Sequence, residues 1–443
     1  MDKKGISFSL GFASVALTAL IFSANLNAQQ NDDPHKNETK MQSLARLTKV
    51  IGMVENSYVD DLNLSQVVDK SIAGLLLQLD AHSNFMNEKD FKDLQEQTSG
   101  EFGGLGIQIG MKDSALTVIA PIEGTPADKK GIKANDVILR IDGNSTIGMS
   151  LDEAVSKMRG KPKTDVTITI VRKGENKPFD VKITRDIIKS QSVYAKTIES
   201  ENILYLRVTN FDAKVTADAK RIINENKDAK GIILDLRNNP GGLLDQAIGL
   251  VNLFVNSGVI VSQRGQKKEE NIEYKADSAK KITNLPLVVL VNGGSASASE
   301  IVSGALQDLK RGIIVGEKTF GKGSVQAILP VSEKEALRLT IARYYLPSGR
   351  SIQAVGVTPD ILVSAGKVAT DDETTFSLKE ADLKQHLQSE LDKIDTKTDK
   401  DKKEKQDDKK IITKKQILDD IQLKTAIDGV KILNLTSNKG DEK

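Results

Sequence analysis

Three serines at a predicted strand-to-helix crossing have the placement that suits a nucleophile. The crossing is Asn292-Gly293-Gly294-Ser295-Ala296-Ser297-Ala298-Ser299-Glu300, between an apolar run at 287–291 and an apolar pattern of helical spacing at 301–309. The two glycines permit a sharp turn, and a hydroxyl there lies at a sheet rim beside the free N–H groups of a helix start. A polar turn with a serine cap has the same local sequence. The local sequence also does not choose among Ser295, Ser297 and Ser299.

A serine nucleophile needs a general base, and Lys322 is the candidate that the sequence offers. The chain has 3 histidines, and none is close in sequence to the serines. Lys322 lies between Gly321 and Gly323 and follows Phe320 closely, which is unusual for a solvated lysine. Its amine must be neutral to accept a proton, so its pKa must fall from about 10.4 to roughly 7–8. This shift corresponds to a destabilisation of the ammonium, relative to the neutral amine, by about 3–4 kcal/mol. Burial can produce that shift, and Ser–Lys pairs are a known variant of the serine triad. An exposed loop lysine is the alternative.

Gln326 has the position to support that amine. On a strand, Lys322 and Gln326 face the same side, but at about 3.3 Å per residue they start about 13 Å apart. The glycines around Lys322 permit the bend that a contact would need. The amide of Gln326 would then orient the neutral amine without adding a charge. An ordinary strand residue is the alternative.

A tetrahedral oxyanion needs backbone N–H donors. The loop Arg237-Asn238-Asn239-Pro240-Gly241-Gly242 follows a buried apolar run, as the serine crossing does. Since ligands bind at the carboxyl ends of parallel strands, we expect the two loops to meet at one site. The N–H groups of Gly241, Gly242 and Ala298 are the predicted donors, and a simple glycine turn is the alternative for this loop.

The elements that must position these residues alternate between strand and helix. This rhythm predicts an α/β core with a mostly parallel sheet and helices on its faces. The expected strands are 202–208, 231–236, 287–291 and 312–316, and the expected helices are 216–226, 243–254 and 301–309.

Two further regions precede this core. Residues 99–186 contain short alternating strands and glycines, which predict a compact α+β unit with a helix at 151–159. Residues 41–79 carry apolar stripes at three- and four-residue spacing, which predict amphipathic helices.

The ends of the chain have their own composition. Lys3 and Lys4 precede an apolar run, which predicts a secretory leader at 1–28 or an uncleaved membrane anchor, with the rest of the protein outside the cytoplasm. In residues 390–410 nearly every second residue is charged, with acids and bases in about equal number, which predicts a solvated linker. It is followed by a predicted helix at 417–433 that docks back or binds a partner. We therefore divide the chain into a leader or anchor (1–28), a helical region (29–98), the α+β unit (99–186), the core (187–365), and a linker with a C-terminal helix (366–443).

The composition excludes several classes of function. A net charge of +2, no tryptophan and 4% aromatic residues give no sign of a nucleic-acid partner. The absence of cysteine excludes disulfides, thiolate metal sites and a cysteine nucleophile. With so few histidines we expect no metal and no cofactor.

Several motifs occur in order along the chain. They are Tyr58-Val59-Asp60, 79–83 (with Ala81), 234–242, 292–301, 316–326 and 342–360. Together they resemble the C-terminal processing (tail-specific) serine peptidases, which usually have proline where Ala81 stands. The resemblance spans roughly residues 41–362, and the unit at 99–186 resembles the PDZ domain of that family.

The resemblance implies roles for individual residues. Ser297 is the implied nucleophile, because the lysine of the family falls 25 positions later, as Lys322 does. Gln326 matches the position that supports this lysine, and Asp308 matches an acid with a structural role. The implied core is similar to the crotonase/Clp fold.

The PDZ resemblance implies a mode of substrate binding. The loop of Gly104, Leu105, Gly106 and Ile107 would turn N–H groups toward the terminal carboxylate of a peptide, which would add as a strand. Val155 would line an apolar pocket, and Arg159 or Arg140 would respond to the bound peptide.

The resulting expectation is an exported serine endopeptidase that recognises the C-terminal tail of its protein substrates and cleaves them by a Ser–Lys mechanism. Its expected partners are proteins with exposed apolar C-termini, an adaptor protein, and further copies of itself through the 41–79 helices. One alternative is a catalytically inactive PDZ adaptor on a peptidase fold. A trypsin-like PDZ protease is disfavoured by the strand–helix rhythm and by the scarcity of histidine.

Overall fold

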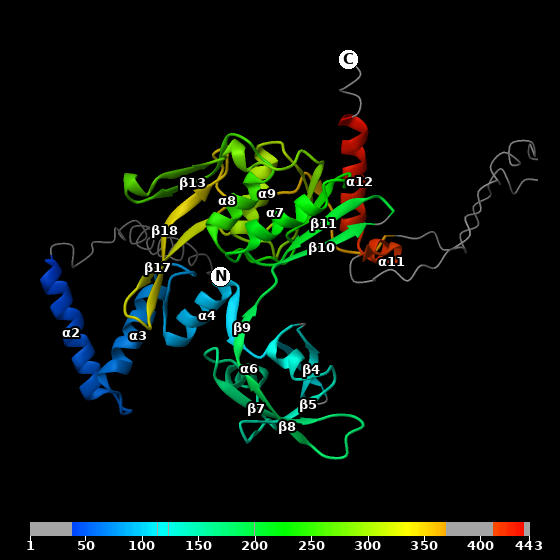
Figure 1. Ribbon diagram of the computed structural model, residues 1–443. Coiled ribbons are helices and arrows are strands. Elements are labelled where there is room, and N and C mark those ends of the chain that lie inside the picture. The colour runs from blue at the N-terminus through cyan, green and yellow to red at the C-terminus, as the bar shows by residue number, and fades with distance from the viewer. Residues whose placement is uncertain (1–37, 113, 123, 199, 369–410, 438–443) are drawn as a thin grey trace, which may run out of the picture. The chain divides into compact units, whose positions relative to one another are not determined.

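The computed structural model describes residues 38–112, 114–122, 124–198, 200–368 and 411–437 (Figure 1). The chain divides into two compact units, Met1–Ala81 and His82–Lys443, and each is described by itself. The predicted leader at 1–28 and the predicted charged linker at 390–410 lie outside the described residues.

Two helices form the described part of the first unit, α2 (Lys40–Ser57) and α3 (Leu64–Leu77). They confirm the helices predicted at 41–79. Each begins with a capping box, in which Thr39 or Asn63 and a glutamine three residues later satisfy backbone N–H groups. Among the described helices of the whole chain, none is long and apolar enough to cross a membrane.

The centre of the second unit is a seven-stranded sheet with the order β19-β16-β15-β12-β11-β10-β20. Only the pair β10–β11 is antiparallel, which confirms the mostly parallel sheet predicted from the strand–helix rhythm. The strands are β10 (Val193–Ile198), β11 (Ile203–Val208), β12 (Ile232–Asp235), β15 (Leu287–Val291), β16 (Ile313–Gly316), β19 (Ile361–Leu362) and β20 (Ile411–Ile412).

The strand β15 is apolar and buried at every position because both faces of the sheet are covered, and β12 is apolar up to Asp235 at its carboxyl end. Alternate residues point to opposite faces: Leu287 and Val289 pack on one side with α7 (Val215–Glu225), α8 (Leu244–Asn252) and α9 (Ala298–Asp308). Val288 and Leu290 pack on the other side with α12 (Ile421–Ser437). Figure 1 shows α12 (red) separated by the sheet from the other three helices.

The C-terminal segment, residues 411–437, is part of this second unit. Its first residues form β20, which pairs with β10, and α11 (Lys414–Leu418) leads into α12. Leu423, Ala426 and Val430 of α12 are buried against the sheet. Of the two alternatives for the helix predicted at 417–433, the structure shows the one in which it packs back on the core, and it divides the segment into two helices, α11 and α12.

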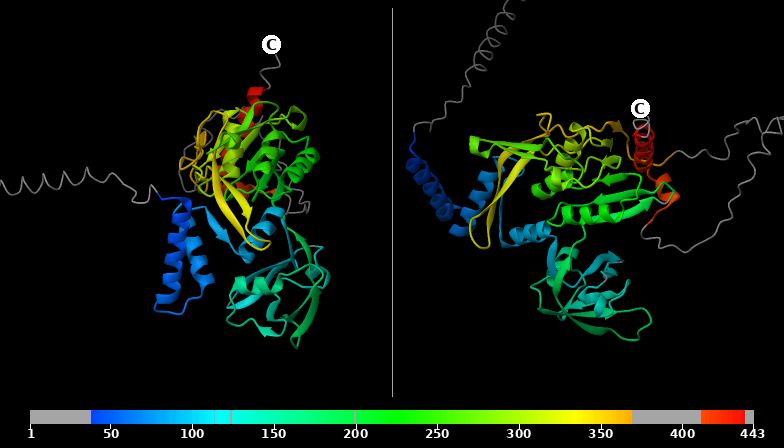
Figure 2. Two further views of the ribbon diagram at one scale, coloured as in Figure 1. Left: turned by 90° about the vertical axis from the view of Figure 1, so that its left-hand side faces the viewer. Right: turned by 45° about the horizontal axis from the view of Figure 1, so that its top comes forward.

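A second, antiparallel sheet was not predicted. Its strands are β1 (Asn84–Met86), β13 (Val259–Gly265), β14 (Ile272–Lys275), β17 (Ser324–Pro330) and β18 (Ala336–Tyr345). Figure 2 shows β17 and β18 (yellow) as a long hairpin that extends past the central sheet. The helix α4 (Glu88–Ser99) follows β1 and lies almost wholly within the region 29–98 that was expected to be helical, but no separate helix was predicted there because it carries few apolar residues.

The α+β unit has the predicted strands and helix. A six-stranded antiparallel sheet has the order β3-β4-β5-β7-β8, with β6 paired to β5, and α6 (Leu151–Met158) packs on it. Two short strands, β2 (Glu101–Gly104) and β9 (Asp186–Lys189), pair where the chain enters and leaves this unit. The remaining elements are β3 (Ile107–Lys112), β4 (Ala115–Pro121), α5 (Pro126–Lys129), β5 (Val137–Ile141), β6 (Asn144–Ser145), β7 (Asp165–Val171) and β8 (Phe179–Thr184).

Candidate active site

Ser297 differs from the two serines beside it at the start of α9. The hydroxyls of Ser295 and Ser299 are fully buried and donate to the carbonyl oxygens of Leu236 and Asn239, at 2.8 and 2.9 Å. Ser297 is only partly buried and has φ +54° and ψ −111°, a backbone conformation that costs free energy for any residue except glycine. The outer serines fasten the turn to the neighbouring loop and leave Ser297 as the accessible hydroxyl.

An asparagine pair joins the two loops at this sheet edge. The Asn292 side-chain amide donates to Asn238 Oδ1 at 2.9 Å, and the Asn238 N–H donates back to Asn292 Oδ1 at 2.9 Å. Asn238 has φ +56°, a conformation that asparagine tolerates better than most residues. The loops at 237–242 and 292–294 therefore meet at one site, as predicted from their places at strand ends.

Gly241 and Gly242 lie so close to their neighbours that no other residue fits. Their φ angles are +107° and +144°. A Cβ at Gly241 would lie 2.9 Å from Ser297 Cβ and 3.0 Å from the nitrogen of Ala298, and one at Gly242 would lie 2.3 Å from the carbonyl oxygen of Phe211. The glycine loop thus packs directly against Ser297.

One of the three N–H groups predicted to surround an oxyanion is in use within its own loop. The Gly241 N–H donates to Asn239 Oδ1 at 2.9 Å, so it is not available in this conformation. Within the described part of the chain, the N–H groups of Gly242 and Ala298 donate to no acceptor. Ala298 is the first residue of α9, where backbone N–H groups have no partner inside the helix.

The fully buried carboxylate of Glu300 connects the serine turn to the lysine loop. Its Oε2 accepts the N–H groups of Ser297 and Lys322, at 2.8 Å each. Its Oε1 accepts the Thr319 hydroxyl and the Gly321 N–H, at 2.6 Å each. The sequence analysis missed this role, although a glutamate three residues after a serine cap is the signal of a capping box.

The backbone around Lys322 is fixed on both sides. Gly321 has φ +97°, and its carbonyl accepts the N–H of Ala354 at 2.8 Å. The Gly323 N–H donates to Gln353 Oε1 at 2.9 Å, and a Cβ at Gly323 would lie 2.5 Å from the Gln353 nitrogen. The Lys322 side chain is partly buried.

Gln326 follows a bulge in the hairpin of β17 and β18. The pairing register shifts between Val325 and Gln326, which is the kind of bend that the sequence required there. The Gln326 side-chain NH₂ donates to Thr340 Oγ1 at 2.7 Å and to Ser324 Oγ at 3.2 Å. Its Oε1 is buried and, among the described residues, receives no hydrogen bond. A buried acceptor without a donor is costly, so this oxygen is suited to bind an N–H from within the site.

These residues line one cleft of about 400 Å³. Besides Ser297, Lys322 and Gln326, the lining includes the glycine loop, α4 and the β17–β18 hairpin. The lining contains no Asp or Glu side chain, and no group of three or more His, Asp and Glu in the described parts of the chain could hold a metal ion. The cleft therefore brings together the Ser297 hydroxyl, the Lys322 amine, the Gln326 amide and backbone N–H groups, and its polar lining also includes Thr98, Ser324, Arg338 and Tyr344.

Comparison with known proteins assigns this arrangement to a family. The "Carboxy-terminal-processing protease" of Bartonella bacilliformis is 43% identical over 394 residues, which cover 87% of this chain and 88% of that protein. The chain belongs to the carboxy-terminal-processing proteases. It is therefore a serine-type peptidase, and the resemblance noted in the sequence is confirmed.

Two family models and a second relative agree with this assignment. Family models for peptidase family S41 and for the PDZ domain match residues 202–363 and 103–183 of this protease. The "Carboxy-terminal processing protease CtpA" of Bacillus subtilis is 36% identical, covering 71% of this chain and 68% of that protein. Among solved structures, a photosystem II D1 C-terminal processing protease is 29% identical, covering 73% of this chain and 87% of that chain, with a TM-score of 0.42.

The PDZ domain of this protease has an open strand edge. Within the described residues β3 pairs only with β4, so its other edge can accept a peptide strand. At the start of β3, Leu105 is buried and Gly106 has φ +77°. Val155 of α6 is partly buried. Gly104 lies in β2, opposite Asp186 of β9.

Arg159 lies at the end of α6. Its guanidinium pairs with Glu96 of α4 at 3.0 Å and lies over the ring of Phe102 at 4.6 Å. It is the arginine of this PDZ domain that contacts α4, whereas Arg140 lies within β5.

Asp308, at the end of α9, is a structural acid, as the family resemblance implied. It accepts the N–H of Ser348 at 3.0 Å and pairs with Arg350 at 2.9 Å. These contacts hold the turn after β18 against the core.

Proposed function

We propose that this protease hydrolyses peptide bonds with Ser297 as the nucleophile and Lys322 as the general base. One observation carries the proposal: the N–H groups of both residues donate to the same oxygen of Glu300, at 2.8 Å each, and both side chains line one cleft. A shared buried anchor fixes the backbone of a nucleophile relative to that of its base, as this chemistry requires.

The proposed reaction begins when the neutral Lys322 amine takes the proton of the Ser297 hydroxyl. The Ser297 Oγ forms a bond to the substrate carbonyl carbon, and the tetrahedral intermediate collapses as the peptide C–N bond breaks. The lysine passes its proton to the leaving amine. Water then attacks the acyl carbonyl carbon while the same lysine takes its proton, and the lysine gives that proton to Ser297 Oγ as the acyl C–O bond breaks.

The N–H groups of Gly242 and Ala298 are assigned the role of donating hydrogen bonds to the oxyanion of this intermediate. Both N–H groups belong to backbone that packs around Ser297, and neither donates to an acceptor among the described residues. The Gly241 N–H could donate to the oxyanion only after its hydrogen bond to Asn239 Oδ1 is broken. Loss of one such donor typically costs about 10²–10³ in kcat.

Gln326 is assigned to the orientation of the lysine. Its Oε1 is a buried acceptor that lacks a donor in the described structure, and the residue lines the same cleft as Lys322. An uncharged acceptor would hold the amine without favouring the ammonium.

The substrates are assigned to proteins with exposed apolar C-termini. The open edge of β3 and the loop of Gly104, Leu105, Gly106 and Ile107 support capture of such a tail as an added strand. Val155 would contact its last apolar side chain, and Arg159, through Glu96 of α4, would respond to its arrival. The adaptor expected from the sequence would deliver these proteins.

Ser297→Ala and Lys322→Met test the catalytic proposal on a model protein with an apolar tail, with cleavage followed by mass spectrometry. We expect each variant to lose at least about 10³-fold in kcat/KM, since each removes a reacting group. Ser348→Ala and Lys318→Met, at exposed positions, are the matched controls and should cleave as the wild type does. Wild-type cleavage by Lys322→Met would rule out the lysine as base.

We further propose that the protease is exported by the leader at 1–28. The support is the sequence alone, because these residues are outside the described part of the chain. Amino-terminal sequencing of the mature protein should begin at Gln29, and a chain that retains Met1 would instead indicate an uncleaved segment.

A further inference from the structure

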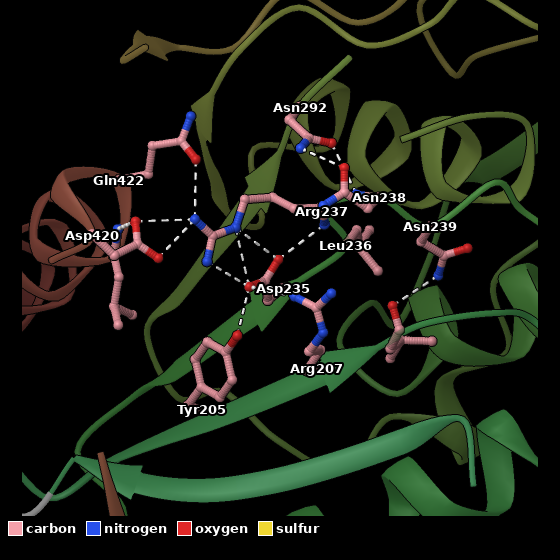
Figure 3. Close-up of polar contacts among 12 residues, drawn as sticks. Tyr205, Arg207, Asp235, Leu236, Arg237, Asn238, Asn239, Asn292, Asp420 and Gln422 are labelled. Atoms are coloured by element: carbon pink, nitrogen blue, oxygen red, sulfur yellow. Dashed lines mark hydrogen bonds and ion pairs between the residues drawn. The ribbon is translucent and has the colours of Figure 1, made fainter. Parts of the chain in front are cut away.

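Arg237 is held between an acid of the sheet and the C-terminal segment. Its Nε and Nη2 donate to the Asp235 carboxylate at 3.1 and 2.7 Å. Its Nη1 donates to Asp420 Oδ1 at 3.0 Å, pairs with Oδ2 at 2.8 Å, and donates to Gln422 Oε1 at 3.0 Å. Figure 3 shows the guanidinium between Asp235 on one side and Asp420 and Gln422 on the other.

The inner side of this arrangement is complete without the C-terminal segment. The fully buried Asp235 carboxylate also accepts the Tyr205 hydroxyl at 2.6 Å, Arg207 Nη1 at 3.3 Å and the backbone N–H of Arg237 at 2.9 Å. Burial and the charge of Asp235 raise the pKa of Tyr205, so its phenol stays protonated and remains a donor. The outward-facing Nη1 of Arg237 is the group that needs the C-terminal segment.

The C-terminal segment presents its two acceptors at a fixed place. Asp420 precedes α12 and accepts the N–H of Leu423 at 3.0 Å, and Gln422 donates to the carbonyl of Val363 at 2.8 Å. Leu423 and Val430 anchor the helix in the core. Asp420 and Gln422 are therefore oriented by their own contacts as well as by Arg237.

Arg237 opens the loop that packs against Ser297. The carbonyl of Leu236, just before it, accepts the buried hydroxyl of Ser295, and the N–H of Asn238, just after it, donates to Asn292. A shift of Arg237 would therefore strain both bonds that align the glycine loop with the serine turn, of which Figure 3 shows the one between Asn238 and Asn292.

We infer that Asp420 and Gln422 are positioning residues for the peptidase reaction. They hold Arg237, and through it the 237–242 loop, in the geometry that aims the Gly242 N–H at the reacting carbonyl. We call the contact of Asp420 and Gln422 with Arg237 a clamp on the active site. In sequence, residues 369–410 separate this C-terminal segment from the rest of the core. The inference rests on the proposed Ser–Lys mechanism.

The test is a double variant, Asp420→Ala with Gln422→Ala, in the full-length protein. Three quantities are measured: kcat and KM on a short peptide, and the rate at which a fluorophosphonate probe labels Ser297, with the labelled site confirmed by mass spectrometry. We expect kcat and the labelling rate to fall at least tenfold while KM changes less than twofold, since misaligned oxyanion donors affect the transition state more than the bound substrate. Asp420→Asn keeps a side-chain oxygen that can accept a hydrogen bond from Arg237, so its kcat and labelling rate should lie between those of the double variant and the wild type.

Two controls separate positioning from general stability. Asp419→Ala removes the neighbouring acid, which pairs with Lys367 at the surface, and should leave both rates unchanged. Ile223→Ala removes a buried side chain of α7, and should lower the melting temperature without lowering kcat below the transition.

The outcomes are distinct. A folded double variant with wild-type kcat and labelling rate overturns the clamp, as does an Ile223→Ala loss of kcat equal to that of the double variant at equal loss of melting temperature. If the probe fails to label Ser297 in the wild-type protein, the proposed mechanism itself is wrong.

Discussion

Four donors converge on the Glu300 carboxylate, and two of them are the backbone N–H groups of the proposed reacting residues, Ser297 and Lys322. A glutamine at this position would present an NH₂ group where one carboxylate oxygen now accepts two hydrogen bonds. At least two buried donors would then lose their acceptor, and each such loss costs about 1–3 kcal/mol.

We therefore predict that Glu300→Gln lowers kcat by about 10²-fold, because a misplacement of about 1 Å between nucleophile and base has that effect. Steady-state kinetics on a peptide substrate provides the measurement, and the exposed Glu333→Gln is the control for the loss of a charge. An undiminished kcat in Glu300→Gln would show that the carboxylate is only a helix cap.

For individual residues, the sequence predicted which side chains form the site better than it predicted the hydrogen bonds among them. The spacing of Ser297 and Lys322 pointed to both residues through a family resemblance. The buried hydroxyls of Ser295 and Ser299 bond to carbonyl groups 59 and 60 residues away in sequence. No local pattern contains such contacts.

Among the elements, the PDZ domain has one ion pair that should affect its stability. The carboxylate of Asp136, at the start of β5, is buried and accepts two bonds from Arg172, at 2.7 Å each, and the N–H of Lys133 at 2.8 Å. Burial alone would raise the pKa of Asp136, but these hydrogen bonds outweigh it and lower the pKa below its usual value.

The direction of the shift fixes its dependence on pH. A carboxyl with a lowered pKa in the folded state stabilises that state above its unfolded pKa of about 3.9, and the contribution is lost as pH falls through the folded value. We predict that Arg172→Met destabilises the PDZ domain by about 2–4 kcal/mol at pH 7, because it leaves a buried carboxylate unpaired. The difference between the variant and the wild type in free energy of unfolding should become smaller as the pH falls below the pKa of Asp136 in the folded state.

Thermal unfolding at several pH values gives the measurement. Lys182→Met, which removes an exposed pair with Asp165, is the control and should cost less than about 1 kcal/mol. A destabilisation by Arg172→Met that persists unchanged in strong acid would argue for lost packing on Phe179, over which the guanidinium lies.

The elements with strong periodicity were predictable, and those with weak periodicity were not. The strand at 287–291 and the helix at 301–309 are apolar and bounded by glycines, so their types were clear. The helix α4 has no buried residue, and the second sheet joins strands as distant in sequence as β1 and β18. Non-local pairing of this kind leaves little trace in a single sequence.

For the whole molecule, the first unit predicts self-association. Leu44, Leu47 and Val50 form an apolar stripe on α2, and each is at least half exposed. Apolar side chains in such a stripe are normally covered by another surface. We predict that the protease sediments as a homodimer or larger assembly and that Leu47→Glu shifts it toward the monomer.

Analytical ultracentrifugation over a range of concentrations distinguishes the two states. Lys49→Glu adds a negative charge at an exposed position of the same helix and is the control. Unchanged sedimentation in Leu47→Glu would mean that α2 is not the contact.

The docking of residues 411–437 also determines when, during synthesis of the chain, the active site acquires its contacts with Asp420 and Gln422. A polypeptide is made from its N-terminus, so β20 and α12 leave the ribosome after every other strand of the central sheet. A nascent chain that stops short of residue 411 already contains Ser297 and Lys322 but lacks both outer partners of Arg237. If the clamp acts as inferred, a chain that has not yet added residues 411–437 cleaves its substrates at least tenfold more slowly than one in which this segment has docked.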